Sequence, residues 1–357
     1  DPPISGMRGR LGAERHLRVW HLDIGGSDPD AAEYGRANRD CCGWWDSLIS
    51  GPGRGLVHVV ATVMVMIETR PNIQRVGVVG CGQMGAGIAE VCVRAGLDTV
   101  VHEIDAAGAE RGRNRLISSF DRAVARDRMT EVERDAAIAR LSFTTDLADM
   151  ADRRMVIEAV IEDEALKTRV FKTLDQVVEA DDAILASNTS SIPIMKLGIA
   201  TERPESVIGI HFFNPVPVLK LVELVTSLMT DSATVDAANH FAEDTLGKIV
   251  IRSKDRAGFV VNALLIPYIL SAIRMMESGF ATAVDIDHGM VEGCNHPMGP
   301  LSLADLIGLD TTLAVAVSMY DEFKEPLYAA PPMLSRMVEA GLLGRKSGRG
   351  FYDYGTK

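Results

Sequence analysis

The sequence predicts an α/β fold, in which a doubly wound parallel sheet is followed by a mainly α-helical C-terminal domain. From Ile73 onward, short apolar runs rich in β-branched residues alternate with helical stretches. This alternation is typical of a parallel sheet that is covered by helices on both faces. A glycine-rich turn joins the first apolar run to the first helix. Beyond about residue 257 the strand pattern fades and helical periodicity replaces it, which indicates a second domain.

The expected sheet contains six strands, each of which is an apolar run bounded by turn residues. They cover residues 76–80, 99–103, 155–161, 183–187, 207–211 and 221–225. A long charged helix is expected over residues 106–128, and a second helix from about residue 130 to residue 141. Thr130 and Glu133 have the spacing of a capping box, in which each side chain accepts a hydrogen bond from a free N–H group of the first turn.

The expected helical domain begins with one long helix over residues 259–277, where Pro267 marks a potential kink. Thr282 and Asp285 have the spacing that caps the next helix. The Pro-Met-Gly-Pro sequence at 297–300 interrupts the pattern before a further helix over 301–307. We therefore expect an α/β domain over residues 71–257 and a helical domain over residues 258–357.

The first 70 residues differ from the rest of the chain. They hold all three tryptophans and many Gly and Arg residues, and they show no clear periodicity. Acidic residues are interspersed, so the segment is a poor transit peptide, and it has no apolar signal core. Met64 and Met66 lie just before the first expected strand. We expect residues 1–70 to be a disordered extension or the product of a wrong start site, and the intact mass of the natural protein would distinguish the two.

Composition limits the class of protein. The 357 residues are 47% hydrophobic and 24% charged, as in globular proteins with two sizeable cores. The net charge of -12 argues against nucleic acid or an anionic membrane as a partner. No apolar run approaches the roughly 20 residues of a membrane-spanning helix. The five cysteines show neither metal-ligand spacing nor a disulfide framework, so we expect no metal and a reducing, cytoplasmic compartment.

The glycine-rich turn has the form Gly80-x-Gly82-x-x-Gly85. In such a motif the first glycine allows a tight turn, the second lets a pyrophosphate approach the backbone, and the third lets the helix pack closely on the strand. The helix N-terminus then offers free N–H groups and the positive end of its dipole to the phosphates. The motif predicts a Rossmann-like domain that binds a dinucleotide.

An acidic residue, Glu103, ends the next expected strand roughly 20 residues later, where this fingerprint places a carboxylate. It would accept hydrogen bonds from the adenosine ribose and repel a 2′-phosphate, so NAD is favoured over NADP. The competing interpretation is that Glu103 is a solvated charge at a strand end.

One stretch combines a histidine with a carboxylate. The apolar run 207–210 leads into His211, a proline-containing turn follows, and a second apolar run carries Glu223. A histidine oriented by a carboxylate is the usual means of moving a proton near pH 7. Taken alone, the pattern is equally compatible with a core histidine that has found a hydrogen-bond partner.

Two further segments bring polar groups to the same region. Ser187-Asn188-Thr189-Ser190-Ser191 follows an expected strand, at the sheet edge where ligands of such folds bind. Asn262 lies on an otherwise apolar helix, where a buried amide needs partners. The alternatives are a Ser/Thr turn with local hydrogen bonds and a satisfied core amide.

Together these motifs resemble the 3-hydroxyacyl-CoA dehydrogenase family, and within it the bacterial short-chain 3-hydroxybutyryl-CoA dehydrogenases. The matching segments are GCGQMG (80–85), EAVIE (158–162), SNTSS (187–191), HFFNP (211–215), GFVVN (258–262), NHPMGP (295–300) and GRKSGRGFY (344–352). They are long, they occur in the family's order, and the resemblance covers roughly residues 73–357.

The resemblance implies a role for each matching residue. His211 would be the catalytic base, Glu223 its orienting carboxylate, and Ser190 and Asn262 would bind the reacting oxygen. The implied cofactor-binding residues are Gly80, Gly82, Gln83, Met84, Gly85, Glu103, Glu162, Lys167 and Asn188. The implied substrate-binding residues are Ser190, Asn214, Asn262, Ser119 and Arg126, of which the last two match positions that touch CoA. Met195 stands where the family often has a lysine, and Lys196 is the neighbouring candidate.

The resemblance also implies an activity, which is the reversible, NAD-dependent oxidation of (S)-3-hydroxyacyl-CoA. It implies an acyl-CoA as the substrate and a homodimer as the assembly. This chemistry would place the protein in fatty-acid and butanoate metabolism. Three alternatives stay open at this point. They are a hydroxy-acid dehydrogenase of the lambda-crystallin or gulonate type, a non-catalytic relative on the same fold, and a fragment of a multifunctional fatty-acid oxidation protein.

Overall fold

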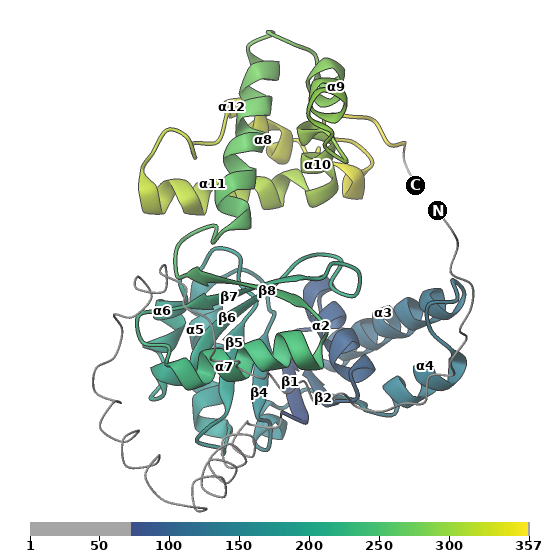
Figure 1. Ribbon diagram of the computed structural model, residues 1–357, viewed down its shortest axis with the longest axis vertical. Coiled ribbons are helices and arrows are strands. Elements are labelled where there is room, and N and C mark those ends of the chain that lie inside the picture. Colours follow the sequence, from purple (N-terminus) through teal and green to yellow (C-terminus); the bar gives the residue numbers. More distant parts are fainter. Residues whose placement is uncertain (1–72, 356–357) are drawn as a thin grey trace, which may run out of the picture. The chain divides into compact units, whose positions relative to one another are not determined.

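A computed structural model describes residues 73–355 of the chain (Figure 1). The expected extension over residues 1–70 lies outside the described residues. Within them, the structure is an α/β unit followed by a group of helices, α8–α12, which confirms the predicted fold class.

The α/β unit is built on one eight-stranded sheet with the strand order β3-β2-β1-β4-β5-β6-β7-β8. The strands are β1 (Arg75–Val79), β2 (Asp98–His102), β3 (Leu141–Thr144), β4 (Met155–Glu158), β5 (Ile184–Ser187), β6 (Val207–Phe212), β7 (Leu221–Thr226) and β8 (Ile249–Lys254). Strands β1–β6 are parallel to one another, and the strand order reverses between β1 and β4. This is the topological switch point at which doubly wound folds bind ligands.

The sheet departs from the predicted parallel arrangement at one edge. Strand β7 runs antiparallel to β6, and β8 runs parallel to β7. The turn at residues 213–220 holds no helix. A parallel crossover needs a dozen or more residues, so this connection can join only antiparallel strands.

Two strands were missed by the sequence analysis, and both lie at sheet edges. Strand β3 begins at Leu141, the residue that was expected to end a helix. Strand β8 is partly exposed along its length, and its second half is polar. Edge strands need only one apolar face, so their composition resembles that of loops.

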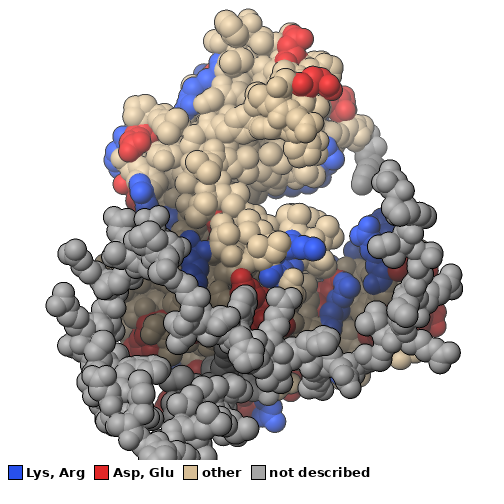
Figure 2. Space-filling model, in the orientation of Figure 1, with Lys and Arg blue, Asp and Glu red and all other residues tan. Residues whose placement is uncertain are grey.

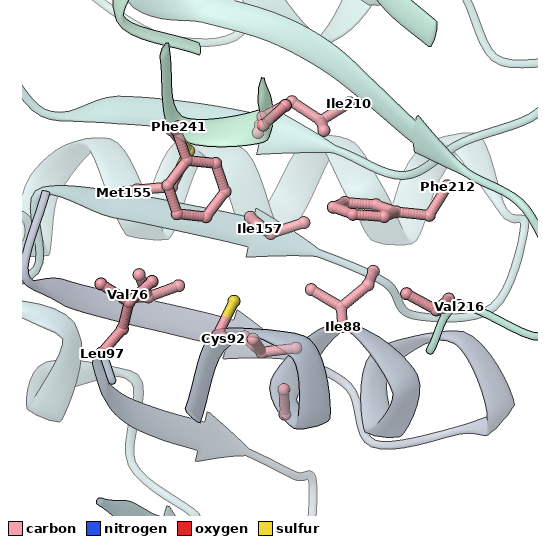
Figure 3. Close-up of a cluster of buried hydrophobic side chains, with 14 of the residues drawn as sticks. Val76, Ile88, Cys92, Leu97, Met155, Ile157, Ile210, Phe212, Val216 and Phe241 are labelled. Carbon is pink, nitrogen blue, oxygen red and sulfur yellow. The ribbon is translucent and has the colours of Figure 1, made fainter. Parts of the chain in front are cut away.

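Helices cover both faces of the sheet. They are α2 (Gln83–Arg94), α3 (Ala106–Val124), α4 (Glu131–Ile138), α5 (Glu164–Val177), α6 (Ile194–Gly198) and α7 (Ser232–His240), with a π-helical turn at Phe241–Thr245 and short 3₁₀ turns at Leu147–Met150 and Pro204–Ser206. On one face, side chains of α2, α3 and α7 pack on alternate residues of the strands, including Val76, Ile157 and Ile210 (Figure 3). On the other face, α5 and α6 pack on the intervening residues, such as Val156 and Leu185.

The predicted helix signals are largely confirmed. Thr130 and Glu133 form the complete capping box at the start of α4, and the Thr282 hydroxyl accepts a hydrogen bond from the N–H of Asp285. Helix α3 ends at Val124 rather than at residue 128, and Asp127 has a positive φ of 54°. The predicted helix at residue 259 begins at Val261 instead, because Phe259, with a φ of 45°, does not have a helical backbone.

The C-terminal helices form a third apolar core. They are α8 (Val261–Glu277), α9 (Ala283–Cys294), α10 (Pro300–Ile307), α11 (Leu309–Phe323) and α12 (Pro332–Glu339), followed by a 3₁₀ turn at Arg345–Ser347. Pro267 lies inside α8 without ending it. Asp305 on α10 accepts hydrogen bonds from the N–H groups of Phe351 and Tyr352, which ties down the C-terminal segment. Across residues 73–355, no single helix is long and apolar enough to cross a membrane, and only the α10–α11 pair, bent by 97°, reaches that length and composition together.

The first prediction concerns the core in Figure 3. Phe241 is fully buried between α7 and the sheet. Replacing it with alanine leaves a cavity and should lower the free energy of unfolding by about 3–5 kcal/mol. Urea denaturation followed by circular dichroism measures this change. The control is Ile249→Ala on edge strand β8, where the side chain is 58% exposed and the expected change is within about 0.5 kcal/mol. Equal destabilisation by both substitutions would contradict the assignment of the core.

Candidate active site

The central feature of the site is a buried histidine–carboxylate pair. His211 Nδ1 lies 2.7 Å from Glu223 Oε2, and the two side chains are 5% and 0% exposed. The two residues are direct cross-strand neighbours in the register of β6 and β7. In an antiparallel pair, residues that face each other in this way point their side chains to the same face of the sheet. The antiparallel return of β7 beside β6 therefore creates the pair.

The second oxygen of Glu223 is also satisfied. Its Oε1 accepts hydrogen bonds from the N–H groups of Val260 and Val261, at 3.1 and 2.9 Å. These groups belong to the start of α8, where free N–H groups and the helix dipole stabilise a negative charge. Both carboxylate oxygens therefore have hydrogen-bond partners within the protein. The carboxylate orients the imidazole so that Nδ1 faces Glu223 and Nε2 faces away from it.

Nε2 of His211 faces a serine from the neighbouring strand connection. Ser190 Oγ lies 3.0 Å from it, on the loop that follows β5. The Asn188 side chain accepts a hydrogen bond from the N–H of Phe212 at 2.9 Å, which joins the end of β5 to the end of β6. The rings of Phe213 and Phe259 lie 4.7 and 5.5 Å from the imidazole ring. The imidazole therefore contacts two aromatic rings, and its Nε2 is directed toward Ser190.

The glycine-rich turn fits a dinucleotide. A Cβ on Gly80 would lie 2.8 Å from the carbonyl oxygen of Ala159, and one on Gly85 would lie 1.9 Å from that of Gly80. Both positions therefore require glycine for packing. Gly82 differs, since a Cβ there would meet nothing within 4 Å, and no side chain caps the first turn of α2. Open space in front of uncapped N–H groups is what a pyrophosphate requires.

Glu103 lies beside this turn. Its Oε1 accepts a hydrogen bond from the N–H of Cys81 at 2.5 Å, and its Oε2 accepts one from the N–H of Ile104. Arg115 donates to the carbonyl oxygen of Cys81 at 2.6 Å. The carboxylate is thus fixed to the backbone of the glycine turn at the end of β2, rather than free in solvent. The Cys81 thiol is buried within the turn, and burial, together with the charge of Glu103, raises its pKa to about 12, so it stays a neutral packing group.

Glu162 and Lys167 lie at the start of α5 and make contacts within the protein. Lys167 is 1% exposed, and its Nζ lies 3.1 Å from Glu162 Oε2. Burial acts to raise the pKa of Glu162, but the charge of Lys167 and the hydrogen bonds from Thr189 and Ser191 outweigh it, so the pKa lies below its ordinary value.

The remaining predicted residues are spread more widely. Asn214 accepts a hydrogen bond from Gln83 at 3.1 Å, which links the turn after β6 to the start of α2, next to Met84. Asn262 lies in the first turn of α8, directly after Val261, which binds Glu223. Ser119 lies on α3, and Arg126 is exposed beyond the end of that helix.

Lys196, the candidate substitute for the family's lysine, is 50% exposed and forms an ion pair with Glu164 at 2.7 Å. Among residues 73–355, no group of three or more His, Cys, Asp or Glu side chains is arranged to hold a metal ion.

Two residues near the site carried no assigned role in the sequence analysis. Glu158, at the end of β4, is fully buried and bound to Lys167. Lys248 donates to the carbonyl oxygens of Val216 and Leu219 and so anchors the turn that carries Asn214. Burial, followed by the charge of Arg94, lowers the pKa of Lys248. An acid at the end of an apolar strand was a signal for Glu158, whereas Lys248 lies in a polar stretch that gives no such signal.

The fold and the site define an NAD-binding oxidoreductase that holds a buried histidine–glutamate pair at the edge of its sheet. A family model of the 3-hydroxyacyl-CoA dehydrogenase NAD binding domain matches residues 75–256, and one of the C-terminal domain of the same enzymes matches residues 258–354. The chain belongs to the 3-hydroxyacyl-CoA dehydrogenase family.

Individual relatives agree with this assignment. The chain is 61% identical to a 3-hydroxybutyryl-CoA dehydrogenase of Mycobacterium tuberculosis over 282 residues, which are 79% of this chain and 99% of the relative. It is 37% identical to the mitochondrial hydroxyacyl-coenzyme A dehydrogenase of Sus scrofa, over 79% of this chain and 91% of that protein. The crystal structure of (S)-3-hydroxybutyryl-CoA dehydrogenase from Ralstonia eutropha superposes with a TM-score of 0.76 at 44% identity, and the match covers 80% of this chain and all of the other.

The second prediction tests the glycine turn. Gly82→Ala should fold normally, because its φ of -62° suits any residue and the added methyl group meets no protein atom. The methyl group would occupy the space for the pyrophosphate, so the Kd for NADH should rise about tenfold or more. Fluorescence titration measures the affinity. Gly289→Ala is the matched control, since a Cβ there also meets nothing within 4 Å but lies on α9. Unchanged affinity in Gly82→Ala would rule out this binding mode.

Proposed function

We propose that this protein catalyses the reversible, NAD-dependent oxidation of (S)-3-hydroxyacyl-CoA to 3-ketoacyl-CoA, with 3-hydroxybutyryl-CoA as its substrate. The observation that carries the proposal is the buried His211–Glu223 pair, with Ser190 on the open nitrogen, at the same sheet edge as the dinucleotide turn. The names of the relatives from Mycobacterium tuberculosis and Ralstonia eutropha support the choice of substrate.

NAD, when bound, supplies the hydride acceptor for carbon 3 of the substrate. The chain's own residues handle the proton. As the carbonyl forms, the hydroxyl proton passes to Nε2 of His211, and Glu223 stabilises the resulting imidazolium through Nδ1. Such general-base assistance contributes about 10²–10⁴-fold to the rate. In the reductive direction the imidazolium returns the proton to the same oxygen.

Ser190 and Asn262 act on the reacting oxygen. The Ser190 hydroxyl points at Nε2, so an oxygen bound to that nitrogen also lies within reach of the hydroxyl. Donors placed where charge develops stabilise the transition state more than the ground state. Phe213 and Phe259 keep the imidazole out of water, which strengthens its interaction with Glu223. Ser119 and Arg126 would contact the CoA part of the substrate, where the guanidinium suits a phosphate.

The alternative functions are less well supported. A non-catalytic relative has no need to keep a glutamate in the core behind an oriented histidine, because burying such a polar group is costly. A hydroxy-acid dehydrogenase of the lambda-crystallin or gulonate type would use the same dyad, so substrate preference is what separates it from our proposal.

The third prediction is therefore an assay. NADH should be consumed rapidly with acetoacetyl-CoA and slowly with free acetoacetate, and NADPH should be a poor substitute because Glu103 opposes its 2′-phosphate. Turnover that does not need the CoA ester would move the protein to another hydroxy-acid class.

The control for this assay is His211→Ala. The substitution should lower kcat by about 10²–10⁴-fold while NADH still binds, because the histidine acts on the substrate oxygen rather than on the cofactor. Near-normal turnover in this variant would contradict the mechanism.

We also propose that the protein is a homodimer that associates through its helical domain. Large apolar side chains are exposed there, among them Leu264 (74%), Phe280 (80%) and Val284 (48%). Figure 2 shows few charged side chains over this part of the visible face. Exposed apolar side chains of this size support a surface that is buried on association.

The fourth prediction follows from this surface. Light scattering after size-exclusion chromatography should give the mass of a dimer, and Phe280→Asp should shift it toward the monomer, because the partner would have to bury a charge. Leu228→Asp is the control, since that side chain is 94% exposed but lies after β7 in the α/β unit. A monomeric wild-type protein would refute the proposal.

A further inference from the structure

A second buried carboxylate lies at the sheet edge that carries the site. Glu158 ends β4, between β1 and β5, and is 0% exposed. Its Oε1 accepts hydrogen bonds from the N–H of Val160 at 2.7 Å and from Nζ of Lys167 at 2.8 Å. Its Oε2 accepts hydrogen bonds from Ser187 Oγ at 2.7 Å and from the same Nζ at 2.9 Å. Both oxygens are fully used within the protein, so Glu158 does not contact a ligand.

Lys167 connects this carboxylate to Glu162. Its side chain is 1% exposed, and Nζ lies within hydrogen-bond reach of Glu158 and 3.1 Å from Glu162 Oε2. An ammonium group has three N–H donors, and here these donors face the oxygens of the two carboxylates. Glu158 therefore holds the Lys167 ammonium group in place behind Glu162 through contacts from both of its oxygens.

Glu162 in turn holds the loop after β5. Its Oε1 accepts the N–H groups of Ser190 and Ser191 at 2.9 and 3.1 Å, and the hydroxyls of Thr189 and Ser191 at 2.5 and 2.9 Å. One carboxylate oxygen therefore gathers four donors from three consecutive residues. The middle one of these residues is Ser190, whose hydroxyl lies 3.0 Å from His211 Nε2.

We propose that Glu158 and Lys167 are positioning residues, whose charges fix the Glu162 carboxylate and through it the Ser190 hydroxyl opposite His211. The inference rests on the proposed function, because Ser190 matters only if it binds the reacting oxygen. It assigns a role to Glu158, which touches neither substrate nor cofactor. It also places the main effect of Lys167 on the Ser190 loop rather than on the cofactor.

The test removes both charges together in Glu158→Gln/Lys167→Met. Removing one partner alone would leave an uncompensated buried charge, which destabilises a fold whatever its function, whereas removing both is better tolerated. The matched control is Asp175→Asn/Arg203→Met. It removes another ion pair, with a distance of 2.8 Å and side chains 9% and 19% exposed, that does not contact the Ser190 loop.

The kinetic readout is a double-mutant cycle with Ser190→Ala. The double variant should lower kcat with acetoacetyl-CoA about tenfold or more, with the Kd for NADH changed less than about twofold. When Ser190→Ala is added to the double variant, its fold-reduction of kcat should be at least about threefold smaller than in the wild type, because the hydroxyl is already misplaced. The control double variant should keep kcat and the full effect of Ser190→Ala. Additive effects, or a loss of NADH affinity with kcat unchanged, would overturn the inference.

A spectroscopic readout separates this inference from the proposed function. The ring resonances of His211, assigned by their loss in His211→Ala, should move in the double variant toward their positions in Ser190→Ala. This measurement needs no turnover, so it decides the positioning role even if acetoacetyl-CoA is not reduced. Resonances that stay at their wild-type positions would refute the inference. If the double variant does not fold, Glu158→Asp is the substitute, because it keeps the charge and withdraws the carboxylate by one methylene. It should change kcat and the His211 resonances in the same directions, by smaller amounts.

Discussion

The hydrogen bond between His211 and Glu223 is the interaction on which the rest of the site depends. It exists because β7 returns antiparallel beside β6 and brings the two residues opposite each other. A carboxylate that is 0% exposed is stable only with its hydrogen bonds complete, and the remaining bonds come from the first N–H groups of α8. The same glutamate therefore orients the imidazole and connects the sheet to the helical domain.

Two more carboxylates near the site have their hydrogen bonds satisfied within the protein in the same way. Glu158, Glu162 and Glu223 each accept hydrogen bonds from several donors, and each lies close to the carboxyl end of the parallel strands β4–β6. Polar loops gather at this edge because the helices that cover the faces of the sheet leave it open. Buried charges are costly to place, and a network with all its partners present holds one geometry rather than several. Rigid placement of Ser190 and His211 follows from this arrangement.

The cofactor side of the site uses the backbone instead of charge networks. Gly80 and Gly85 let β1, α2 and the residues after β4 approach more closely than any side chain would allow, whereas Gly82 leaves space. Glu103 adds a carboxylate to this part of the site, and the backbone of the turn holds it in place. Recognition of the dinucleotide thus depends on local sequence, and proton transfer depends on contacts between distant segments.

The difference between local patterns and distant contacts explains what the sequence determined and what the tertiary structure decided. The sequence alone determined the fold class, the glycine turn, the caps at Thr130 and Thr282, and the candidate residues His211 and Glu223, because each is a local pattern whose residues are close together in the chain. The family resemblance added most of the other candidate residues.

Only the tertiary structure decided the edge strands β3 and β8 and the partners of Lys167 and Lys248. The pairing of an edge strand and the partner of a buried charge depend on which distant segments pack together. That choice is made by the burial of the whole sheet and cannot be read from any one segment of the chain.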